Sequence, residues 1–428
     1  MDLRAHVYGN CNEVEMKENW LGRESQGAAR LNRRAFMQSA AGTAASFTII
    51  KPSLVRGYEA NRTVEAGVVG LGGRGSLIAR LLAEHEGYKI VSVADYFPHV
   101  VQAAGEKFGV SADRRFSGLL GYRRLIASGV DAVFLETPPC FFPEHCRAAV
   151  DGGCHVYVAK PLAVDVPGTL AVQEAAVKAK QEGRVFLVDF QTRTDPFNIE
   201  AVKRCRDGII GRVGLLSSVY CDEAFADPPK TKTIESRLQR LIWVNDIELG
   251  GGMLVNAGIH AVDLALWIAG DRPRRAMGSA RQVKADAHGD TCDVYSVTYQ
   301  FESGLVLNHR GEHLRNAHGF ACRCTAFGQY GYMDTGYQGK TWIRGNQGGY
   351  KGGEVEDLYV QGIRRNLETF RRSIGEGVYD NPTVQPSVDS TLATILGRQA
   401  ARGNTELTWE QMLRENRKYE VDLSGLTG

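Results

Sequence analysis

The segment Gly70-Leu71-Gly72-Gly73-Arg74-Gly75 follows directly on the β-prone run of residues 63–69 and leads into a helical pattern over residues 76–84. In a motif with this spacing, the first glycine allows a tight turn, the second lets the backbone approach a pyrophosphate, and the third lets the helix pack closely on the strand. The amides at the start of the helix then face the phosphates. The segment therefore predicts the phosphate-binding turn of a dinucleotide-binding Rossmann domain, with cofactor contacts from Gly70, Gly72, Gly73, Arg74 and Gly75.

A second predicted strand, over residues 89–94, ends at Asp95, twenty residues after Gly75. A carboxylate at this distance from the glycine turn hydrogen-bonds the hydroxyls of the cofactor's ribose. The same charge would repel the 2′-phosphate of NADP, so the sequence favours NAD over NADP. Arg74 and Tyr96 are close enough to modify this preference.

Strand and helix continue to alternate up to about residue 183. Strands are predicted over residues 132–135 and 155–158, and helices over residues 99–108, 143–150 and 170–183. Such alternation is typical of a doubly wound parallel sheet with helices on both faces. Ligands bind these sheets outside the carboxyl ends of the strands, which is where Thr137 and Lys160 follow two predicted strands.

Beyond residue 183 the pattern changes to consecutive β-prone runs, at residues 213–220, 275–283, 293–301, 305–309 and 321–327. Such runs predict an α+β domain. Helices are predicted over residues 354–376 and 387–401, packing near the domain junction, and the glycine-rich stretch 345–353 predicts a mobile loop. We therefore expect an α/β protein with an export signal and linker (residues 1–60), an NAD-binding Rossmann domain (61–183) and an α+β substrate and oligomerisation domain (184–428).

The bulk composition is that of a globular protein with nearly balanced charge. The 428 residues include 51 basic and 49 acidic side chains, for a formal net charge of +2. No strong field therefore recruits nucleic acid, and a small-molecule partner is expected instead. The nine cysteines include no CxxC pair, so the sequence favours free thiols over a zinc site. His309 and His313 would lie about 13 Å apart on a strand, which is too far for both to bind one metal ion. No metal site is therefore predicted.

The N-terminal region carries paired arginines, Arg33 and Arg34, followed by a mildly apolar run over residues 40–50. This pattern resembles a twin-arginine export signal, which is an address rather than part of the fold. The run is too short to span a bilayer, which needs about 20 apolar residues. We therefore expect a partner in the twin-arginine export machinery, a periplasmic or otherwise exported protein, and no stable membrane span. The alternative is a basic amphipathic helix on a cytoplasmic protein.

Further motifs are Glu136-Thr137-Pro138-Pro139 with His145 after it, Ala159-Lys160-Pro161-Leu162-Ala163, and Gly251-Gly252 through Asn256, His260 and Asp263 to Trp267. With the glycine turn they resemble the glucose-fructose oxidoreductase, inositol dehydrogenase and rhizopine-catabolism family (Gfo/Idh/MocA), from residue 64 to about 409. The resemblance implies a two-domain dehydrogenase acting on a sugar or cyclitol, with a large, open, mainly antiparallel second sheet. It adds cofactor contacts from Thr137, Pro138, His145 and Lys160. A homodimer or homotetramer through that sheet is expected.

Two residues are candidates for acid–base chemistry at the reacting carbon. Oxidation of a secondary alcohol needs a base for the hydroxyl proton and a nicotinamide aligned with the carbinol hydrogen. The resemblance assigns Lys160 as a ligand of the substrate hydroxyl and as proton-transfer partner. His260 lies four residues after Asn256 and three before Asp263, so on a helix the three side chains share a face, and a histidine titrates near neutral pH. The alternatives are a solvated lysine in a turn and a buried structural histidine.

Two positions depart from the family pattern. Ala159 stands where a glutamate usually precedes the lysine, and Asn256 replaces a usual aspartate. An amide cannot accept a proton, so Asn256 can replace only the hydrogen bonding of a carboxylate. Two other functions therefore stay open: NAD-dependent glycoside cleavage through a transient keto sugar, and a non-catalytic sugar-binding homologue.

The remaining candidates concern the substrate and the fate of the cofactor. The residues predicted to bind substrate are Asn256, Gln191, Arg193 and Trp243. Arg193 could instead form a structural ion pair, and Trp243 could instead belong to the hydrophobic core. Export adds a constraint, because no nicotinamide pool is expected outside the cytoplasm. We therefore expect NAD to stay bound and to be recycled internally, so that turnover is redox-neutral.

Overall fold

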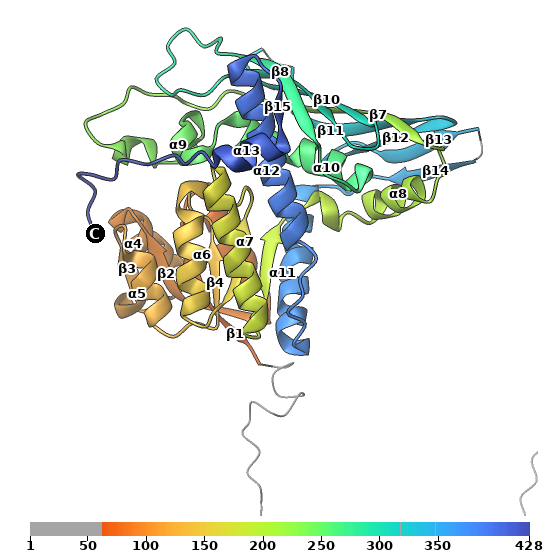
Figure 1. Ribbon diagram of the computed structural model, residues 1–428. Coiled ribbons are helices and arrows are strands. Elements are labelled where there is room, and N and C mark those ends of the chain that lie inside the picture. Colours follow the sequence, from red (N-terminus) through yellow and green to blue (C-terminus); the bar gives the residue numbers. More distant parts are fainter. Residues whose placement is uncertain (1–61, 317, 347) are drawn as a thin grey trace, which may run out of the picture. The chain divides into compact units, whose positions relative to one another are not determined.

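The computed structural model describes residues 62–316, 318–346 and 348–428, which contain two sheets and their covering helices (Figure 1). The predicted twin-arginine segment around Arg33 and Arg34 lies outside these residues.

Six parallel strands form the first sheet, in the order β3-β2-β1-β4-β5-β6. The strands are β1 Val64–Val69, β2 Tyr88–Asp95, β3 Arg115–Ser117, β4 Ala132–Leu135, β5 His155–Ala159 and β6 Phe186–Asp189. The helices between them are α3 Gly73–Ala83, α4 Pro98–Lys107, α5 Gly121–Ala127, α6 Phe142–Asp151 and α7 Val166–Gln181, with 3-10 turns at Ala112–Arg114 and Pro139–Phe141. The predicted doubly wound sheet is confirmed, and β6 lies beyond residue 183, the predicted end of this domain.

Helices cover both faces of this sheet, so its central strands β4 and β5 are buried along their whole length. One face packs against α5, α6 and α7. The other face packs against α3, α4 and α11 Leu358–Glu376, where Ile78, Phe134 and Phe370 belong to one apolar cluster. A helix from the C-terminal part of the chain thereby completes the core of the first domain.

Nine strands form the second sheet, in the order β14-β13-β12-β11-β7-β10-β9-β8-β15. They are β7 Val213–Asp222, β8 Arg275–Arg281, β9 Val294–Gln300, β10 Val306–His313, β11 Ala321–Gly328, β12 Gly331–Gly336, β13 Thr341–Gly345, β14 Gly348–Gly353 and β15 Leu407–Thr408. The pair β7 and β10 is parallel and the other pairs are antiparallel. The predicted large, mainly antiparallel sheet is confirmed.

The glycine-rich stretch 345–353 was predicted as a mobile loop, and this prediction is wrong for Gly348–Gly353. These residues form β14, which pairs with β13 through backbone hydrogen bonds that need no side chain. Gly352 has φ +50°, and a Cβ there would lie 1.8 Å from the carbonyl oxygen of Thr341. The glycines therefore permit a close approach of two backbones.

The helices of the second domain position its half of the site. They are α8 Pro196–Arg206, α9 Ile247–Gly250, the π-helical turn Leu254–Gly258, α10 Ile259–Ala269, α12 Val384–Gly403 and α13 Trp409–Glu415, with 3-10 turns at Thr192–Thr194, Ile234–Arg237 and Ile242–Asn245. α12 packs against β8 and β9 of the second sheet and against α7 of the first domain. The stretch Ile247–Ala269 is long and apolar enough to cross a membrane, but 89% of its apolar window is buried inside the protein, as expected of a core helix.

Candidate active site

A cavity of about 930 Å³ lies at the carboxyl ends of the first sheet and is lined on its other side by the second domain. Most predicted site residues line it: Gly70, Gly72, Gly73, Arg74, Asp95, Thr137, Pro138, His145, Lys160, Trp243, Asn256 and His260. Gly75, Gln191 and Arg193 do not contribute to its lining. The fold therefore brings Lys160 and His260 from two domains to one cavity that also contains the glycine turn.

The glycines of the turn differ in what surrounds them. Gly70 has φ +88°, and a Cβ there would lie 2.7 Å from backbone atoms of Glu136 and Thr137. A Cβ at Gly75 would lie 1.8 Å from the carbonyl oxygen of Gly70, so this glycine lets α3 pack closely on β1. Cβ atoms at Gly72 and Gly73 would meet no heavy atom within 4 Å. The turn thus presents open backbone to the cavity, as a dinucleotide pyrophosphate requires.

Asp95 is fixed at the end of β2 by two backbone amides. Leu71 N–H donates to its Oδ2 at 2.7 Å, and Phe97 N–H donates to its Oδ1 at 3.0 Å. Burial raises the pKa of this carboxyl group, and the two amides oppose that shift. The carboxyl group is therefore tied to the glycine turn itself, and together they fit the adenosine half of NAD.

Lys160 bridges the two domains. Its Nζ donates a 2.7 Å hydrogen bond to the backbone carbonyl of Asn256. Burial, helped by the charge of Arg74, lowers the pKa of Lys160 to about 7, while the carboxylates of Asp189 and Glu136 oppose the shift. An amine with this pKa exchanges a proton near neutral pH, as a general base requires.

His260 lies among aromatic rings at the start of α10. Its ring stacks on Tyr220 with 6.4 Å between centroids and meets the edge of Tyr337 at 5.1 Å. Burial, followed by the charges of Lys160 and Arg74, lowers the pKa of His260 well below its ordinary value. Its Nδ1 is buried and has no hydrogen-bond partner in the described part of the chain. His260 is therefore neutral at neutral pH, where the sequence predicted a titrating group.

Thr137 and His145 form another part of the cavity wall. Thr137 Oγ1 and His145 Nδ1 are 3.3 Å apart. The His145 ring lies 4.1 Å from that of Tyr122, and burial lowers the pKa of His145 to about 4. This histidine therefore presents an uncharged ring to the cavity.

The guanidinium of Arg74 is held by two carboxylates of its own domain. Its Nε lies 3.0 Å from Glu136 Oε2, and its Nη2 pairs with Asp189 Oδ2. Its Nη1 donates to the hydroxyl of Tyr359 at 2.9 Å. The side chains of Glu136 and Asp189 are 0% exposed. Arg74 thus lines the cavity as predicted, but its charge is neutralised within the protein.

Strand register explains how carboxylates flank Lys160 although residue 159 is alanine. Leu135 of β4 pairs with Val158 of β5, and Ala159 pairs with Asp189 of β6. Glu136 therefore directly follows β4 and Asp189 ends β6, the two strands on either side of β5. Neither residue is among the predicted site residues. Glu136 could have been predicted from the sequence, because it directly follows the predicted strand 132–135.

Arg193 and Asp263 form a separate ion pair. Two guanidinium nitrogens of Arg193 donate to the carboxylate at 2.9 to 3.2 Å, and Ser390 Oγ donates to the same carboxylate at 2.7 Å. Asn256 and His260 line the cavity and Asp263 does not, although His260 and Asp263 lie three residues apart in α10. Arg193 therefore forms the structural ion pair that was the alternative to its predicted role in substrate binding.

Gln191 also lies behind the cavity wall. Its Oε1 accepts a 2.7 Å hydrogen bond from the hydroxyl of Tyr337, and the residue is 1% exposed. Three residues that were not predicted line the cavity instead: Tyr220, Asp222 and Tyr359. Tyr220 donates to Asp222 Oδ2 at 3.4 Å. Because these residues come from the second sheet and from α11, no local motif connects them with the glycine turn.

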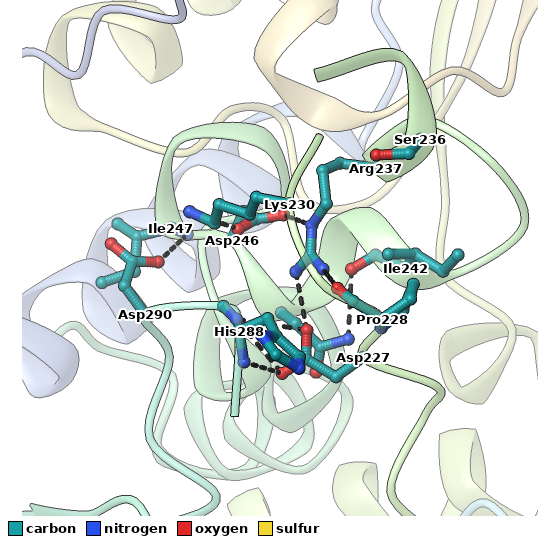
Figure 2. A network of polar contacts seen from close by, with 12 residues as sticks. Asp227, Pro228, Lys230, Ser236, Arg237, Ile242, Asp246, Ile247, His288 and Asp290 are labelled. Atoms are coloured by element: carbon teal, nitrogen blue, oxygen red, sulfur yellow. Dashed lines mark hydrogen bonds and ion pairs between the residues drawn. The ribbon is translucent and has the colours of Figure 1, made fainter. Parts of the chain in front are cut away.

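A loop between β7 and α9 completes the wall with Leu238, Gln239, Arg240, Leu241 and Trp243. Figure 2 shows the polar network that holds it. Arg237 is 1% exposed, and it pairs with Asp246 through Nε at 2.6 Å and with Asp227 through Nη2 at 2.7 Å. Buried ion pairs therefore fix the segment that carries Trp243.

One group of possible metal ligands occurs among the described residues. Possible ligand atoms of Cys221, Glu312 and His318 lie within 4.8 Å of one another. Arg310 Nη2 donates to Cys221 Sγ at 3.4 Å, which places a cation against that sulfur. His309 belongs to a different contact, with its Nδ1 2.8 Å from Ser218 Oγ.

Two family models match the chain. Residues 64–190 match the model described as an oxidoreductase family with an NAD-binding Rossmann fold, and residues 199–334 match the GFO/IDH/MocA C-terminal domain. The chain belongs to the GFO/IDH/MocA family. The glycine turn, Asp95 and Lys160 fall in the NAD-binding part of this GFO/IDH/MocA protein, and Asn256 and His260 fall in its C-terminal domain. It is accordingly an NAD(P)-dependent oxidoreductase.

Relatives and solved structures agree with this assignment. The inositol 2-dehydrogenase of Rhizobium meliloti (strain 1021) is 25% identical over 349 residues, which cover 79% of this chain and 96% of the relative. The aldose-aldose oxidoreductase of Caulobacter crescentus, solved with glycerol, has a TM-score of 0.67 at 21% identity, over 81% of this chain and 100% of that one. GenD2 from gentamicin A biosynthesis, solved with NAD, has a TM-score of 0.64 at 20% identity, over 81% and 96%. The two solved structures share the fold of this GFO/IDH/MocA chain.

Proposed function

We propose that this protein oxidises a secondary hydroxyl of a sugar, a sugar derivative or a cyclitol, with NAD as hydride acceptor. The observation that carries the proposal is that Lys160 and His260, from two domains, line the same cavity as the glycine turn and Asp95. The inositol 2-dehydrogenase that aligns with 79% of this chain supports the substrate class. Asp95 supports NAD over NADP, because its charge would repel a 2′-phosphate.

Each residue then has a defined task. Bound NAD would supply the acceptor for the hydride of the carbinol carbon. Lys160, as a neutral amine, accepts the hydroxyl proton while the backbone carbonyl of Asn256 orients its Nζ. His260 hydrogen-bonds the same substrate oxygen as a neutral ring. The Asn256 side chain and Trp243 bind the substrate, with Asp222 as an additional polar group.

A panel of sugars, glycosides and cyclitols tests this function. We expect the absorbance of NADH to appear with at least one of these compounds. We expect Lys160→Met to abolish this absorbance although the variant still binds NAD. If no member of the panel is turned over and Lys160→Met leaves sugar binding unchanged, the protein is the non-catalytic sugar-binding homologue and the proposal fails.

A second function is glycoside cleavage through a transient keto sugar. It is favoured by Asn256, because this residue places an amide near Lys160 where the family usually has an aspartate. Release of free sugar from a glycoside with catalytic rather than stoichiometric NAD would select this function. Consumption of one NAD per oxidised sugar would select net dehydrogenation.

We also propose that the protein is exported by the twin-arginine machinery with NAD already bound, and that the cofactor is recycled in place. The support is the pairing of Arg33 and Arg34 with an NAD-binding fold. Cell fractionation and nucleotide analysis after exhaustive dialysis test the two parts. Protein that remains in the cytoplasm contradicts export, and protein that loses its NAD on dialysis contradicts recycling in place.

The outer face of the second sheet supports a proposal of self-association. Met277 and Phe327 point away from α10 and α12 and are 37% and 43% exposed. A homodimer or homotetramer would cover them. Light scattering of the wild type and of Phe327→Glu tests this, since a monomeric wild type contradicts the proposal.

A further inference from the structure

Residues 417–428 form a segment without helix or strand that follows α13 of the second domain. Figure 1 shows it in dark blue, running from α13 to the end of the chain labelled C. Most of its residues are exposed. A segment with so little buried surface is held by a small number of contacts and can detach without unfolding the rest of the protein.

The first anchor of the segment is Tyr419. Its N–H donates to Asp165 Oδ2 at 2.8 Å, and Asp165 is the N-cap of α7 in the first domain. The guanidinium carbon of Arg398, in α12, lies over the Tyr419 ring at 5.1 Å from its centroid. Arg398 is 0% exposed, and its Nε and Nη2 have no hydrogen-bond partner among the described residues. The ring therefore provides a buried cation with an electrostatic partner.

The second anchor is Thr427, on the loop between β3 and α5 of the first domain. Leu119 N–H donates to the Thr427 carbonyl at 3.0 Å, and Thr427 N–H donates to the Tyr96 hydroxyl at 3.5 Å. Gly118 has φ +85°, and a Cβ there would lie 2.6 Å from the carbonyl oxygen of Gly428. The two chain segments are thus in direct backbone contact.

The loop at this second anchor forms part of the cavity wall. Tyr96, Gly118 and Leu119 all line the cavity. Tyr96 directly follows Asp95, and Gly118 N–H donates to the Tyr96 carbonyl at 3.1 Å. These residues therefore belong to the side of the cavity that fits the adenosine half of NAD, and the segment 417–428 holds them from outside.

Between its anchors, the segment contacts the loop that carries Trp243. Asp422 and Ser424 line a small cavity of about 100 Å³ together with Thr233. A Cβ at Gly425 would lie 2.7 Å from Thr233 Cγ2. Thr233 caps the 3-10 turn that contains the buried Arg237. The segment therefore joins the wall at the substrate side of the cavity to the wall at the adenosine side.

We propose that residues 417–428 are a detachable strap that keeps NAD in its site. While both anchors are attached, the strap holds the loop at Gly118 and Leu119 closed against the adenosine. Release of NAD requires the Thr427 end to detach, so that this loop can move outward. The proposal rests on the NAD binding of the proposed function, and it gives a physical reason for a cofactor that stays bound through many turnovers.

The first test measures how fast NADH leaves the purified protein, followed by its fluorescence after mixing with excess NAD. A variant that ends at Asn416 lacks both anchors. We expect it to release NADH at least about tenfold faster than the wild type, because it loses a hydrogen bond to a carboxylate and a cation–π contact. Tyr419→Ala, which removes only the ring, should release NADH about two- to tenfold faster.

The matched control is Glu420→Ala, next to Tyr419. The Glu420 side chain is 83% exposed and pairs only with the exposed Lys418, so its loss should leave the release rate unchanged. Equal release rates in the wild type, the shortened protein and Tyr419→Ala overturn the proposal.

A second measurement uses the unaltered protein and does not require a variant to fold. Hydrogen exchange, followed by mass spectrometry, compares the backbone amide of Tyr419 with and without NAD. Tyr419 does not line the cavity, so protection of its amide reports attachment of the strap and not contact with the cofactor. We expect slower exchange in the NAD complex, because NAD stabilises the state in which the strap is attached. Unchanged exchange overturns the proposal.

Both measurements omit sugar, which separates the strap from the reaction. A protein that shows both effects but oxidises no sugar refutes the proposed oxidation and supports the strap. A protein that oxidises a sugar but shows neither effect refutes the strap and supports the oxidation.

Discussion

Lys160 Nζ donates its 2.7 Å hydrogen bond to the backbone carbonyl of Asn256, and not to the side chain that departs from the family pattern. This bond joins the end of β5 to the π-helical turn of the second domain. Because the acceptor is a main-chain oxygen, the position of the lysine does not depend on which side chain occupies residue 256. That side chain can therefore tune Lys160 without moving it.

Asn256→Asp should consequently shift the pH dependence of oxidation. A carboxylate at this position of the cavity wall stabilises the Lys160 ammonium and raises its pKa. The acid limb of kcat/KM should move to higher pH by about one unit, whereas Asn256→Ala, which keeps the backbone carbonyl, should leave the limb in place. Identical pH profiles for the three proteins would contradict this account of residue 256.

The wild type should gain activity as the pH rises through about 7, because Lys160 acts as a base only after its ammonium has lost a proton and its pKa is lowered to about 7. Activity should then level off at higher pH. Lys160→Met should reduce kcat by about two to four orders of magnitude, the usual contribution of a general base. Calorimetry with NAD should show unchanged cofactor binding, and a Lys160→Met protein that retains wild-type kcat would exclude the lysine as base.

Asp95 should control both the choice and the affinity of the cofactor. Asp95→Ala removes the acceptor of the Leu71 amide as well as the charge, so we expect NAD affinity to fall by at least about tenfold, since each lost charge-assisted hydrogen bond is worth about 1.5–3 kcal/mol. Asp95→Asn keeps an acceptor but removes the charge, and should improve NADP binding relative to NAD. Titration calorimetry with both nucleotides measures the ratio, and an unchanged ratio in Asp95→Asn would show that the charge does not select NAD.

Two glycines of the turn offer a matched pair for stability. Gly75→Ala places a methyl group 1.8 Å from the Gly70 carbonyl oxygen, so α3 must move away from β1. We expect a loss of about 1–3 kcal/mol in the free energy of unfolding, as in other overpacked sites. Gly73→Ala meets no atom within 4 Å and should leave stability nearly unchanged. Denaturant unfolding without cofactor compares them, and equal stabilities would show that the close contact at Gly75 is not required.

Arg237 should be important for the cavity wall although it does not line the cavity. Arg237→Ala leaves Asp227 without an ion-pair partner and leaves the buried Asp246 paired with Lys230 alone, and should cost up to about 3–5 kcal/mol. Arg240→Ala, on the exposed part of the same loop, is the control and should change stability by less than about 0.5 kcal/mol. Chemical denaturation gives both values, and a stable Arg237→Ala protein would mean that the network in Figure 2 does not hold the loop.

The sequence by itself predicted the Rossmann domain and most of the residues that line its side of the cavity. These signals are local: Gly70 to Gly75 must form a turn between one strand and one helix, and Asp95 ends the next strand. The motifs around Lys160 and His260 also indicated the second half of the site. Strand alternation predicted five strands of the second sheet, but the glycine-rich strand β14 was missed because its pairing depends on the backbone and not on side-chain pattern.

Only the tertiary structure decided how the charges are distributed around Lys160. Glu136, Asp189 and Arg74 lie far apart in the chain, and they meet because β1, which leads to α3 and Arg74, is the parallel neighbour of β4, followed in the sheet by β5 and β6. The same applies to Arg193, which was predicted to bind substrate and pairs with Asp263, 70 residues further along the chain. Local motifs determine which groups are present at strand ends, whereas strand order, register and burial determine which of those groups are paired and which can take up a proton.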